Sequence, residues 1–326
     1  MPSLLLDNNS ATFWLPEQAS TFAPGHDWLF YFIYWLSVIA FAGCMGVMTY
    51  FAFKYRRRSK DQRTSPSEGN TKLEIFWSAV PALFFLVIFA TGFKTYIDAL
   101  VPPANATEIR VVGYKWFWEI RYANGQTKTN ELVVPVNTPV RLVMSSEATS
   151  PQDPAVIHSF FIPAFRTKRD VLPYRYTVVW FEATQTGTFD LFCTEYCGTG
   201  HSKMIGSVRV VEQDEFEQAI QPAPWDESVE TFAEFGQRTM VEAGCTACHS
   251  TDGSRVVGPS FKGIWGTTET MADGTTAEVD ANYVRESIMD PMAGIVAGYP
   301  PSMPTFAGRL TDQQIDGLIE YIKSLQ

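Results

Sequence analysis

Residues 193–204 read Cys-Thr-Glu-Tyr-Cys-Gly-Thr-Gly-His-Ser-Lys-Met, which places two thiols, an imidazole, a thioether and a carboxylate within twelve positions. A second histidine, His158, lies 35 positions upstream of Cys193 in a chain with four histidines and five cysteines. Thiolate, imidazole and thioether are soft and borderline ligands that copper selects. One Cys, two His and one Met indicate a mononuclear blue-copper centre, whereas the second Cys favours two coppers bridged by two thiolates. The alternative is a disulfide between Cys193 and Cys197 in a small loop, beside an unrelated His and Met.

This segment resembles subunit II of the haem-copper cytochrome c oxidases, whose pattern Cys-x-Glu-x-Cys-x3-His-x2-Met is met at every position. The resemblance implies the binuclear copper centre CuA, in which both thiolates bridge both metals and each copper takes one histidine. It also implies that Met204 is the weak axial ligand of one copper and that the backbone carbonyl of Glu195 serves the other. A magnesium ion at the interface with subunit I, bound through Glu195, is a further expectation. The implied copper ligands are His158, Cys193, Glu195, Cys197, His201 and Met204.

A second redox motif lies downstream, where residues 245–249 read Cys-Thr-Ala-Cys-His, the attachment sequence for c-type haem. Cys245 and Cys248 would form the two thioether bonds, and His249 would bind the iron. Half a zinc site or a dithiol redox pair are alternatives, but zinc needs two more ligands, and no Cys or His occurs in the remaining 77 residues. Resemblance to small class I cytochromes c implies that Met303, in Met-Pro-Thr-Phe, is the distal ligand. In that family a proline carbonyl, here that of Pro259, orients the proximal imidazole. The rival methionines, which lack this context, are Met271, Met289 and Met292.

Two apolar segments predict membrane-spanning helices. Residues 28–53 are 26 positions without a charge, and a helix of that length exceeds the roughly 30 Å hydrocarbon core of a bilayer. Residues 75–93 add 19 uncharged positions. Residues 54–72 hold seven Lys or Arg against two acids, so the positive-inside rule places this loop in the cytoplasm and both termini outside. With the resemblance, we expect the bacterial inner (plasma) membrane, with the copper and haem domains on the periplasmic side.

Cys44 lies within the first apolar segment, after Phe-Ala-Gly, a context that faintly resembles a bacterial lipoprotein cleavage site. A signal peptide needs a positively charged start and a short apolar run. Residues 1–27 hold three acids and no Lys or Arg, and the apolar run continues well past Cys44. We therefore expect a buried small apolar thiol at this position.

Short β-branched runs separated by Gly, Pro, Asn and Thr predict strands at 111–112, 132–136, 140–144, 176–180 and 207–211. Several such runs indicate a sandwich or barrel, and the resemblance implies a cupredoxin-like barrel whose last strands are joined by residues 193–204. Residues 214–220 have the pattern of a short helix. Residues 228–243 and 311–325 have helical spacing that matches the terminal helices of a small cytochrome c. Thr311 and Gln314 form a candidate capping box for the last helix.

The expected fold is therefore multidomain: a two-helix transmembrane hairpin, an all-β cupredoxin-like barrel and an all-α class I cytochrome c domain. An extracytoplasmic segment at 1–27 is expected to precede the hairpin at 28–97, whose helices span about 28–53 and 74–97. The copper domain is expected at 98–213, a linker at 214–227 and the cytochrome c domain at 228–326.

Two further residues gain a role from the resemblance. Tyr-Lys-Trp-Phe-Trp at 114–118 corresponds to the stretch of subunit II whose first tryptophan passes electrons to CuA, which is Trp116 here. A buried aromatic strand is the other interpretation, and we prefer it for Trp118. Glu74, in Leu-Glu-Ile-Phe-Trp, matches the acid near the cytoplasmic mouth of a proton channel of the oxidase. Any Asp or Glu at such a place could instead stabilise a helix N-terminus.

The net charge of −10 is unevenly distributed along the chain. Residues 226–326 hold 15 acids and 6 bases, and this charge of −9 suits a basic electron donor, although it also serves solubility. The expected partners are oxidase subunit I and other oxidase subunits, a donor cytochrome or quinol-oxidising complex, and membrane lipid. Nothing basic or aromatic in the chain indicates nucleic acid.

The resemblance as a whole implies a cytochrome c oxidase subunit that relays electrons from an external donor through haem c to CuA and on to subunit I. Oxygen would be reduced to water there, with proton translocation, because four histidines are too few for a catalytic haem-copper centre on this chain. The same count nearly excludes nitrous oxide reductase, which needs a multi-copper site. The alternatives are a CuA-bearing subunit of a nitric oxide reductase and a membrane copper chaperone. A chaperone has no use for a haem c with a matched axial methionine.

Overall fold

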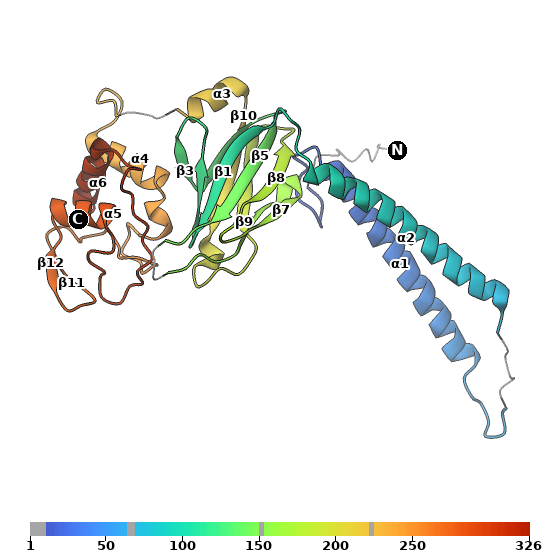
Figure 1. Cartoon of the computed structure of the whole chain (residues 1–326). Helices are drawn as coiled ribbons and strands as arrows, with labels where there is room; N and C mark the ends of the chain where they lie inside the picture. Colours follow the sequence, from blue (N-terminus) through green and yellow to red (C-terminus); the bar gives the residue numbers. More distant parts are fainter. Residues whose placement is uncertain (1–10, 64–68, 150–152, 222–224) are drawn as a thin grey trace, which may run out of the picture. The chain divides into compact units, whose positions relative to one another are not determined.

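The computed structural model describes residues 11–63, 69–149, 153–221 and 225–326, and Figure 1 shows their helices and strands in chain order. Contacts divide the chain into two compact units, Met1–Gln18 with Phe22–Val101, and Ala19–Thr21 with Pro102–Gln326. Parts of four predicted segments lie outside the described residues: the start of 1–27, five positions of the basic loop, residues 150–152 of the predicted copper domain, and residues 222–224 of the predicted linker.

The first unit is a pair of long helices, α1 (Ala23–Lys54) and α2 (Thr71–Leu100), which contact each other along the hairpin. Both are long and apolar enough to cross a membrane. The predicted helix limits were too narrow because polar first turns extend each helix beyond its apolar run. Pro24 occupies the first turn of α1, where a missing backbone N–H costs nothing. In α2 the side chain of Asn70 accepts a hydrogen bond from the backbone N–H of Leu73 at 3.2 Å.

The structure contradicts the expectation for Cys44. Its side chain is exposed on α1 instead of being buried. The apolar run that surrounds it faces outward nearly all round, as a helix in contact with lipid does.

The second unit begins with a barrel of two five-stranded sheets, as the sequence predicted. One sheet has the order β3-β2-β1-β5-β8 and the other the order β4-β10-β9-β6-β7. The strands are β1 (Thr107–Tyr114), β2 (Phe117–Arg121), β3 (Thr127–Thr129), β4 (Glu131–Pro135), β5 (Pro139–Ser146), β6 (His158–Ile162), β7 (Thr167–Val171), β8 (Thr177–Glu182), β9 (Gly187–Cys193) and β10 (Ile205–Val211).

Alternating burial shows how these strands enclose a core. In β5 every second residue is buried, so one face packs inward and the other meets solvent. Parallel pairing of β1 with β5 and of β10 with β4 accompanies antiparallel pairs elsewhere. Ser20 adds a bridge to Ala183, and its hydroxyl donates to the carbonyl of Phe165 at 2.8 Å. The short turns η1 (Pro163–Phe165) and η2 (His201–Lys203) and the helix α3 (Gln213–Ala219) complete this part.

The C-terminal part is helical, with α4 (Phe232–Glu242), η3 (Cys245–Ala247), α5 (Ala281–Met289) and α6 (Asp312–Ser324). The predicted capping box of Thr311 and Gln314 is confirmed, and a second one, of Thr231 and Glu234, starts α4 four residues later than predicted. A small hairpin of β11 (Thr268–Thr270) and β12 (Thr276–Glu278) corrects the all-α description in detail.

Helices α4 and α6 cross at a pair of glycines. A Cβ on Gly236 would overlap the carbonyl oxygen of Gly317, and a Cβ on Gly317 would lie 3.3 Å from the Cα of Gly236. Two hydrogen side chains therefore let the helix backbones touch. Below this crossing the core is built from Met240, Val279, Val284, Ile288, Phe306, Ile315, Leu318, Ile319 and Ile322.

Candidate functional site

Sheet pairing brings the two halves of the predicted copper site together. Cys193 is the last residue of β9, and the loop that follows it returns to β10 at Ile205. His158 is the first residue of β6, which pairs with β9 through Phe160 opposite Cys193. His158 is 35 positions before Cys193 in the sequence, but the pairing of β6 with β9 places it beside the ligand loop.

Every predicted ligand atom of the copper site lies near one of two sulfurs. The Sγ atoms of Cys193 and Cys197 are 3.8 Å apart and not bonded to each other. His158 Nδ1 lies 3.8 Å from Cys193 Sγ, and His201 Nδ1 lies 3.5 Å from Cys197 Sγ. Each sulfur therefore has its own imidazole. The remaining contacts are Met204 Sδ to Cys197 Sγ at 3.8 Å and the Glu195 carbonyl oxygen to Cys193 Sγ at 3.3 Å.

The two thiols are electrostatically unequal. A hydrogen bond from Cys197 holds the pKa of Cys193 well below its usual value, and the same closeness together with burial raises the pKa of Cys197. Soft sulfur and borderline nitrogen donors that converge in a buried place fit copper, and three of them, on His158, Cys193 and Cys197, lie within 4.8 Å of one another.

Trp116 packs against the same loop. Its indole N–H donates a hydrogen bond to the carbonyl oxygen of Cys197 at 3.0 Å. The ring lies over two glycines, since a Cβ on Gly200 would lie 2.6 Å from its Cε3 atom and a Cβ on Gly198 would lie 3.0 Å from Cζ2. Trp118, in contrast, is fully buried and packs edge-on against His158 and Phe160, which confirms the core interpretation for this residue.

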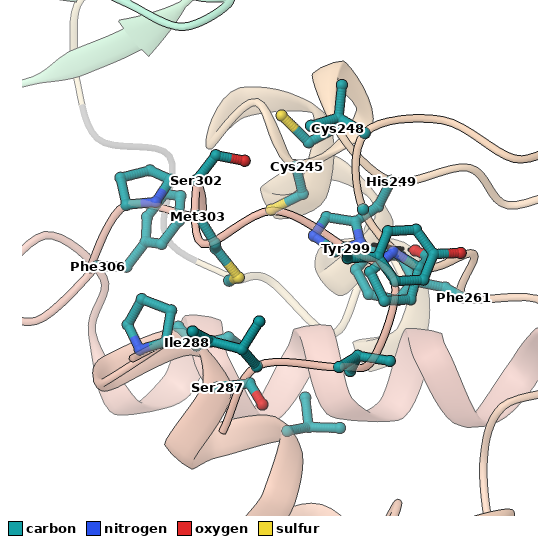
Figure 2. Close-up of a pocket in the computed structure, with 18 of the residues that line it drawn as sticks. Cys245, Cys248, His249, Phe261, Ser287, Ile288, Tyr299, Ser302, Met303 and Phe306 are labelled. Carbon is teal, nitrogen blue, oxygen red and sulfur yellow. Dashed lines mark hydrogen bonds between the residues drawn. The ribbon is translucent and has the colours of Figure 1, made fainter. Parts of the chain in front are cut away.

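The predicted haem residues line one large apolar cavity in the C-terminal part. Cys245 and Cys248 lie on and beside η3, and Figure 2 shows them at one rim, with His249 and Met303 farther in. Burial raises the pKa of Cys245 to about 12 and that of Cys248 to about 11, so both thiols stay neutral. Aliphatic and aromatic side chains form most of the wall, which suits a flat apolar group such as a porphyrin.

The contact expected between the His249 imidazole and the Pro259 carbonyl is present in the structure. His249 Nδ1 lies 2.7 Å from the carbonyl oxygen of Pro259, which leaves Nε2 as the nitrogen available to a metal. Phe261 stacks on the imidazole at 4.4 Å, and a Cβ on Gly258 would lie 2.7 Å from Cε1. Burial lowers the pKa of His249, so the ring is neutral and can act as a ligand.

Among the candidate distal ligands, Met303 and Met292 both line the cavity, whereas Met271 and Met289 do not. Figure 2 shows the thioether of Met303 turned into the space between the labelled side chains. The structure thus narrows the choice to two of the four methionines weighed from the sequence.

Glu74 lies far from this chemistry in the chain, in the first turn of α2 within the other unit. The cap of that helix is Asn70, so Glu74 adds charge near the helix N-terminus without being its cap.

Sequence reasoning missed several residues of the site. Phe117 lines the haem cavity, Gly198 and Gly200 seat Trp116, and Lys115 forms an ion pair with Asp153 at 2.5 Å next to Trp116. The spacing Gly-Thr-Gly inside the ligand loop was a signal for close backbone approach. Phe117 had no comparable signal, because its contact with the cavity is a tertiary one.

Comparison with known proteins gives three matches to family models. Residues 8–95 match the transmembrane domain of cytochrome C oxidase subunit II, residues 126–211 its periplasmic domain, and residues 233–326 cytochrome c.

Curated relatives of the chain are named cytochrome c oxidase subunit 2. Cytochrome c oxidase subunit 2 of Alkalihalophilus pseudofirmus is 29% identical over 302 residues, which cover 89% of this chain and 83% of the relative. That of Thermostichus vulcanus is 31% identical over 270 residues, which cover 64% of this chain and 80% of the relative. A crystal structure of the periplasmic domain of subunit II of cytochrome oxidase of Bradyrhizobium japonicum is 31% identical and covers 37% of this chain and 94% of that domain, with a TM-score of 0.33.

Proposed function

Because the chain belongs to the cytochrome c oxidase subunit II family, we propose that it is the subunit through which electrons reach a membrane haem-copper oxidase. An external donor would reduce haem c, from which electrons would pass to CuA and then to subunit I. Oxygen would be reduced to water on subunit I, with proton translocation. The observation that carries this proposal is that an imidazole from β6 converges on a loop that holds two free thiols, a second imidazole and a thioether, in a chain that also holds a complete haem-attachment motif.

We propose Cys193 and Cys197 as the bridging ligands of the copper pair, with one histidine for each metal. The near-symmetric contacts of His158 with one sulfur and His201 with the other support this assignment. Met204 and the carbonyl of Glu195 would complete the set. When bound, the two coppers and the haem supply one-electron carriers, and the protein's part is to hold their ligands in a rigid barrel.

The side chain of Glu195 is exposed while its carbonyl faces Cys193. The carboxylate is therefore free to bind a second, hard cation, and carboxylate oxygens are ligands that magnesium accepts. We propose a magnesium ion there, shared with subunit I.

In the haem domain we propose thioether bonds from Cys245 and Cys248, with His249 and Met303 as axial ligands. The bond to Pro259 fixes the tautomer and orientation of the imidazole, which makes it a better ligand. An axial methionine gives a higher potential than a second histidine would, which suits a carrier that feeds an oxidase.

The two long helices and the match to a periplasmic domain support a membrane protein with its domains outside. We propose that the membrane is the bacterial inner membrane and that the copper and haem domains are periplasmic. The acidic haem domain would attract a basic donor.

For Glu74 we propose a role in proton uptake from the cytoplasm. Its place in the first turn of α2, next to the basic loop, supports it. Glu74→Ala should slow steady-state oxygen consumption of the assembled oxidase while a rapid donor still reduces haem c and CuA at the parent rate. Normal turnover per assembled complex would retire this role and leave a purely electrostatic one at the helix N-terminus.

The test of the proposed function is the intact complex purified from membranes. It should contain two coppers in this subunit and one covalent haem c, and reduced donor should lead to oxygen consumption. A complex that consumed nitric oxide instead of oxygen would favour a nitric oxide reductase subunit. Copper without any haem-to-copper electron transfer would refute the relay.

A further inference from the structure

Within the second unit, the β1–β2 hairpin contacts the haem-attachment segment at residues 245–249. Val112, Tyr114 and Phe117 of β1 and β2 form a buried cluster, and Ala247, between the two haem cysteines, packs against it. Phe117 also lines the haem cavity. The edge of the haem site therefore rests on the hairpin that carries Trp116.

A glycine permits this close contact. Gly244, just before the haem motif, has a positive φ of 77°, and a Cβ there would lie 2.7 Å from the Cβ of Thr129 in β3. Any side chain at position 244 would both strain the backbone and push the two surfaces apart.

A buried carboxylate lies at the same surface. Glu119 of β2 is 1% exposed, and its two oxygens face two guanidinium groups. Arg121, from the same strand, approaches Oε1 at 2.5 Å, and Arg309, from the haem domain, forms an ion pair with the other oxygen. Arg121 also donates to the hydroxyl of Tyr114 at 3.2 Å, and that hydroxyl donates to Glu147 at 2.8 Å.

The two arginines that face Glu119 come from different parts of the chain, Arg121 from the same strand and Arg309 from the haem domain. A buried carboxylate is costly unless its charge is compensated, and truncating one partner of such a pair leaves the other charge stranded. Arg121 is always present beside Glu119, whereas Arg309 reaches it only while the haem domain lies on the hairpin. Arg309 is partly buried, with 24% of its side chain exposed, and lies 4.8 Å over the ring of Phe306, so it is positioned by the haem-domain core.

The copper loop is part of the same neighbourhood. A cavity beside it is lined by Lys115, Trp116 and Cys197 from the barrel and by residues 300–302 from the haem domain, just before Met303. Trp116 precedes Phe117 in sequence and bonds to the Cys197 carbonyl. The haem side and the copper side thus meet at one hairpin.

We propose that the Arg309–Glu119 ion pair is a latch that holds the haem domain on the β1–β2 hairpin, so that electrons pass from haem to copper within a docked chain. This inference rests on the proposed relay function. Glu119 and Arg309 are positioning residues, which touch neither metal site.

The experiment compares Glu119→Gln, Arg309→Gln and the double variant with the parent in the purified complex. The rate of haem-to-copper electron transfer is followed after photochemical reduction of haem c, at low and high salt. We expect each single variant to slow transfer by at least about tenfold, because the ion pair that joins the haem domain to the hairpin is lost. The tethered domain would still collide with the barrel, so the residual transfer should become salt-dependent, unlike that of the parent.

A second readout does not depend on electron transfer. Backbone hydrogen exchange in residues 127–131 and 302–310 should speed up in both single variants, because these segments lose their cover. The double variant should be no slower in electron transfer than the slower single variant, since both changes break one interaction. Arg285→Gln is the matched control, because Arg285 pairs with Asp312 and Asp316 inside the haem domain.

The copper electron paramagnetic resonance signal and the haem spectrum report whether each variant is folded and loaded. Arg309 lies in a loop, so Arg309→Gln remains informative even if Glu119→Gln fails to fold. Transfer rates and exchange equal to those of Arg285→Gln would overturn the latch. A parent that lacks the binuclear copper signal would refute the proposed function itself.

Discussion

Substitution of Gly200 by alanine should displace Trp116 without changing any predicted metal ligand. The added Cβ would lie 2.6 Å from Cε3 and 2.7 Å from Cγ of the indole, whereas ordinary contact begins at 3.4 Å. The closest ring atom, Cδ2, would lie only 2.4 Å from this Cβ, so the ring must retreat by about 1 Å. Such a shift strains or breaks the 3.0 Å hydrogen bond to the Cys197 carbonyl.

The change in unfolding free energy is the sum of two destabilising contributions and one stabilising contribution. Overpacking of this kind costs about 1–3 kcal/mol, and loss of the hydrogen bond costs about 0.5–1.5 kcal/mol. Replacing glycine in the unfolded chain returns about 0.4–1 kcal/mol. The net loss of about 2 kcal/mol should lower the melting midpoint of a domain of this size by about 8 °C.

The assay is thermal unfolding of the copper-loaded protein, followed by loss of the copper–thiolate absorption. Ser202→Ala is the matched control, because Ser202 is exposed in the same loop. Truncation of Trp116 to leucine should cost less in the Gly200→Ala background than in the parent, by about 1 kcal/mol or more. A midpoint for Gly200→Ala equal to that of the control, or additive effects of the two changes, would refute this packing.

Three further outcomes are expected. Cys197→Ser should replace the hyperfine pattern of an electron shared by two coppers with that of a single copper or none, while the haem spectrum stays unchanged. Met303→His should keep the haem attached but lower its potential by about 0.1 V or more and abolish the near-infrared band of iron–methionine ligation. Loss of that band in Met292→Ala would instead identify Met292 as the ligand. Gly236→Ala should force α4 away from Gly317 and lower the unfolding free energy of the haem domain by about 1–3 kcal/mol, measured by denaturant titration of the Soret band.

Local patterns in the sequence predicted the elements whose signals are local. The β-branched runs at 132–136, 140–144 and 207–211 lie in β4, β5 and β10, and the Thr311–Gln314 capping box is present. Strand β6 was missed because it is buried on both faces and shows no alternation, and β7 because its centre is charged. The helix starts at Asn70 and Thr231 depend on side-chain caps, which hydrophobic periodicity does not reveal.

The site residues likewise fall into those that a local sequence pattern predicts and those that only the tertiary structure brings together. The ligand loop is contiguous, so its Cys, His and Met residues were recognised from their spacing, together with His158 upstream. The role of the Glu195 carbonyl came from the resemblance. That His158 lies beside Cys193 depends on the register of β6 against β9, which no local pattern specifies. The pairing of Glu119 with Arg309 joins residues far apart in the chain, and nothing in either neighbourhood predicts it.

The closeness of Cys193 and Cys197 has a consequence for how the protein is made. Their sulfurs lie 3.8 Å apart, and the pKa of Cys193 is lowered, so the pair is ready to oxidise to a disulfide in an oxidising compartment such as the proposed periplasm. Copper delivery therefore competes with air from the moment the barrel folds. In protein produced without copper, the number of maleimide-reactive thiols at Cys193 and Cys197 should fall over time from two to none. In copper-loaded protein, both thiols should react with maleimide once the metal has been removed anaerobically. Assembly of the copper site therefore requires that copper binds before the disulfide forms, or that a reductant outside the membrane reduces the disulfide again.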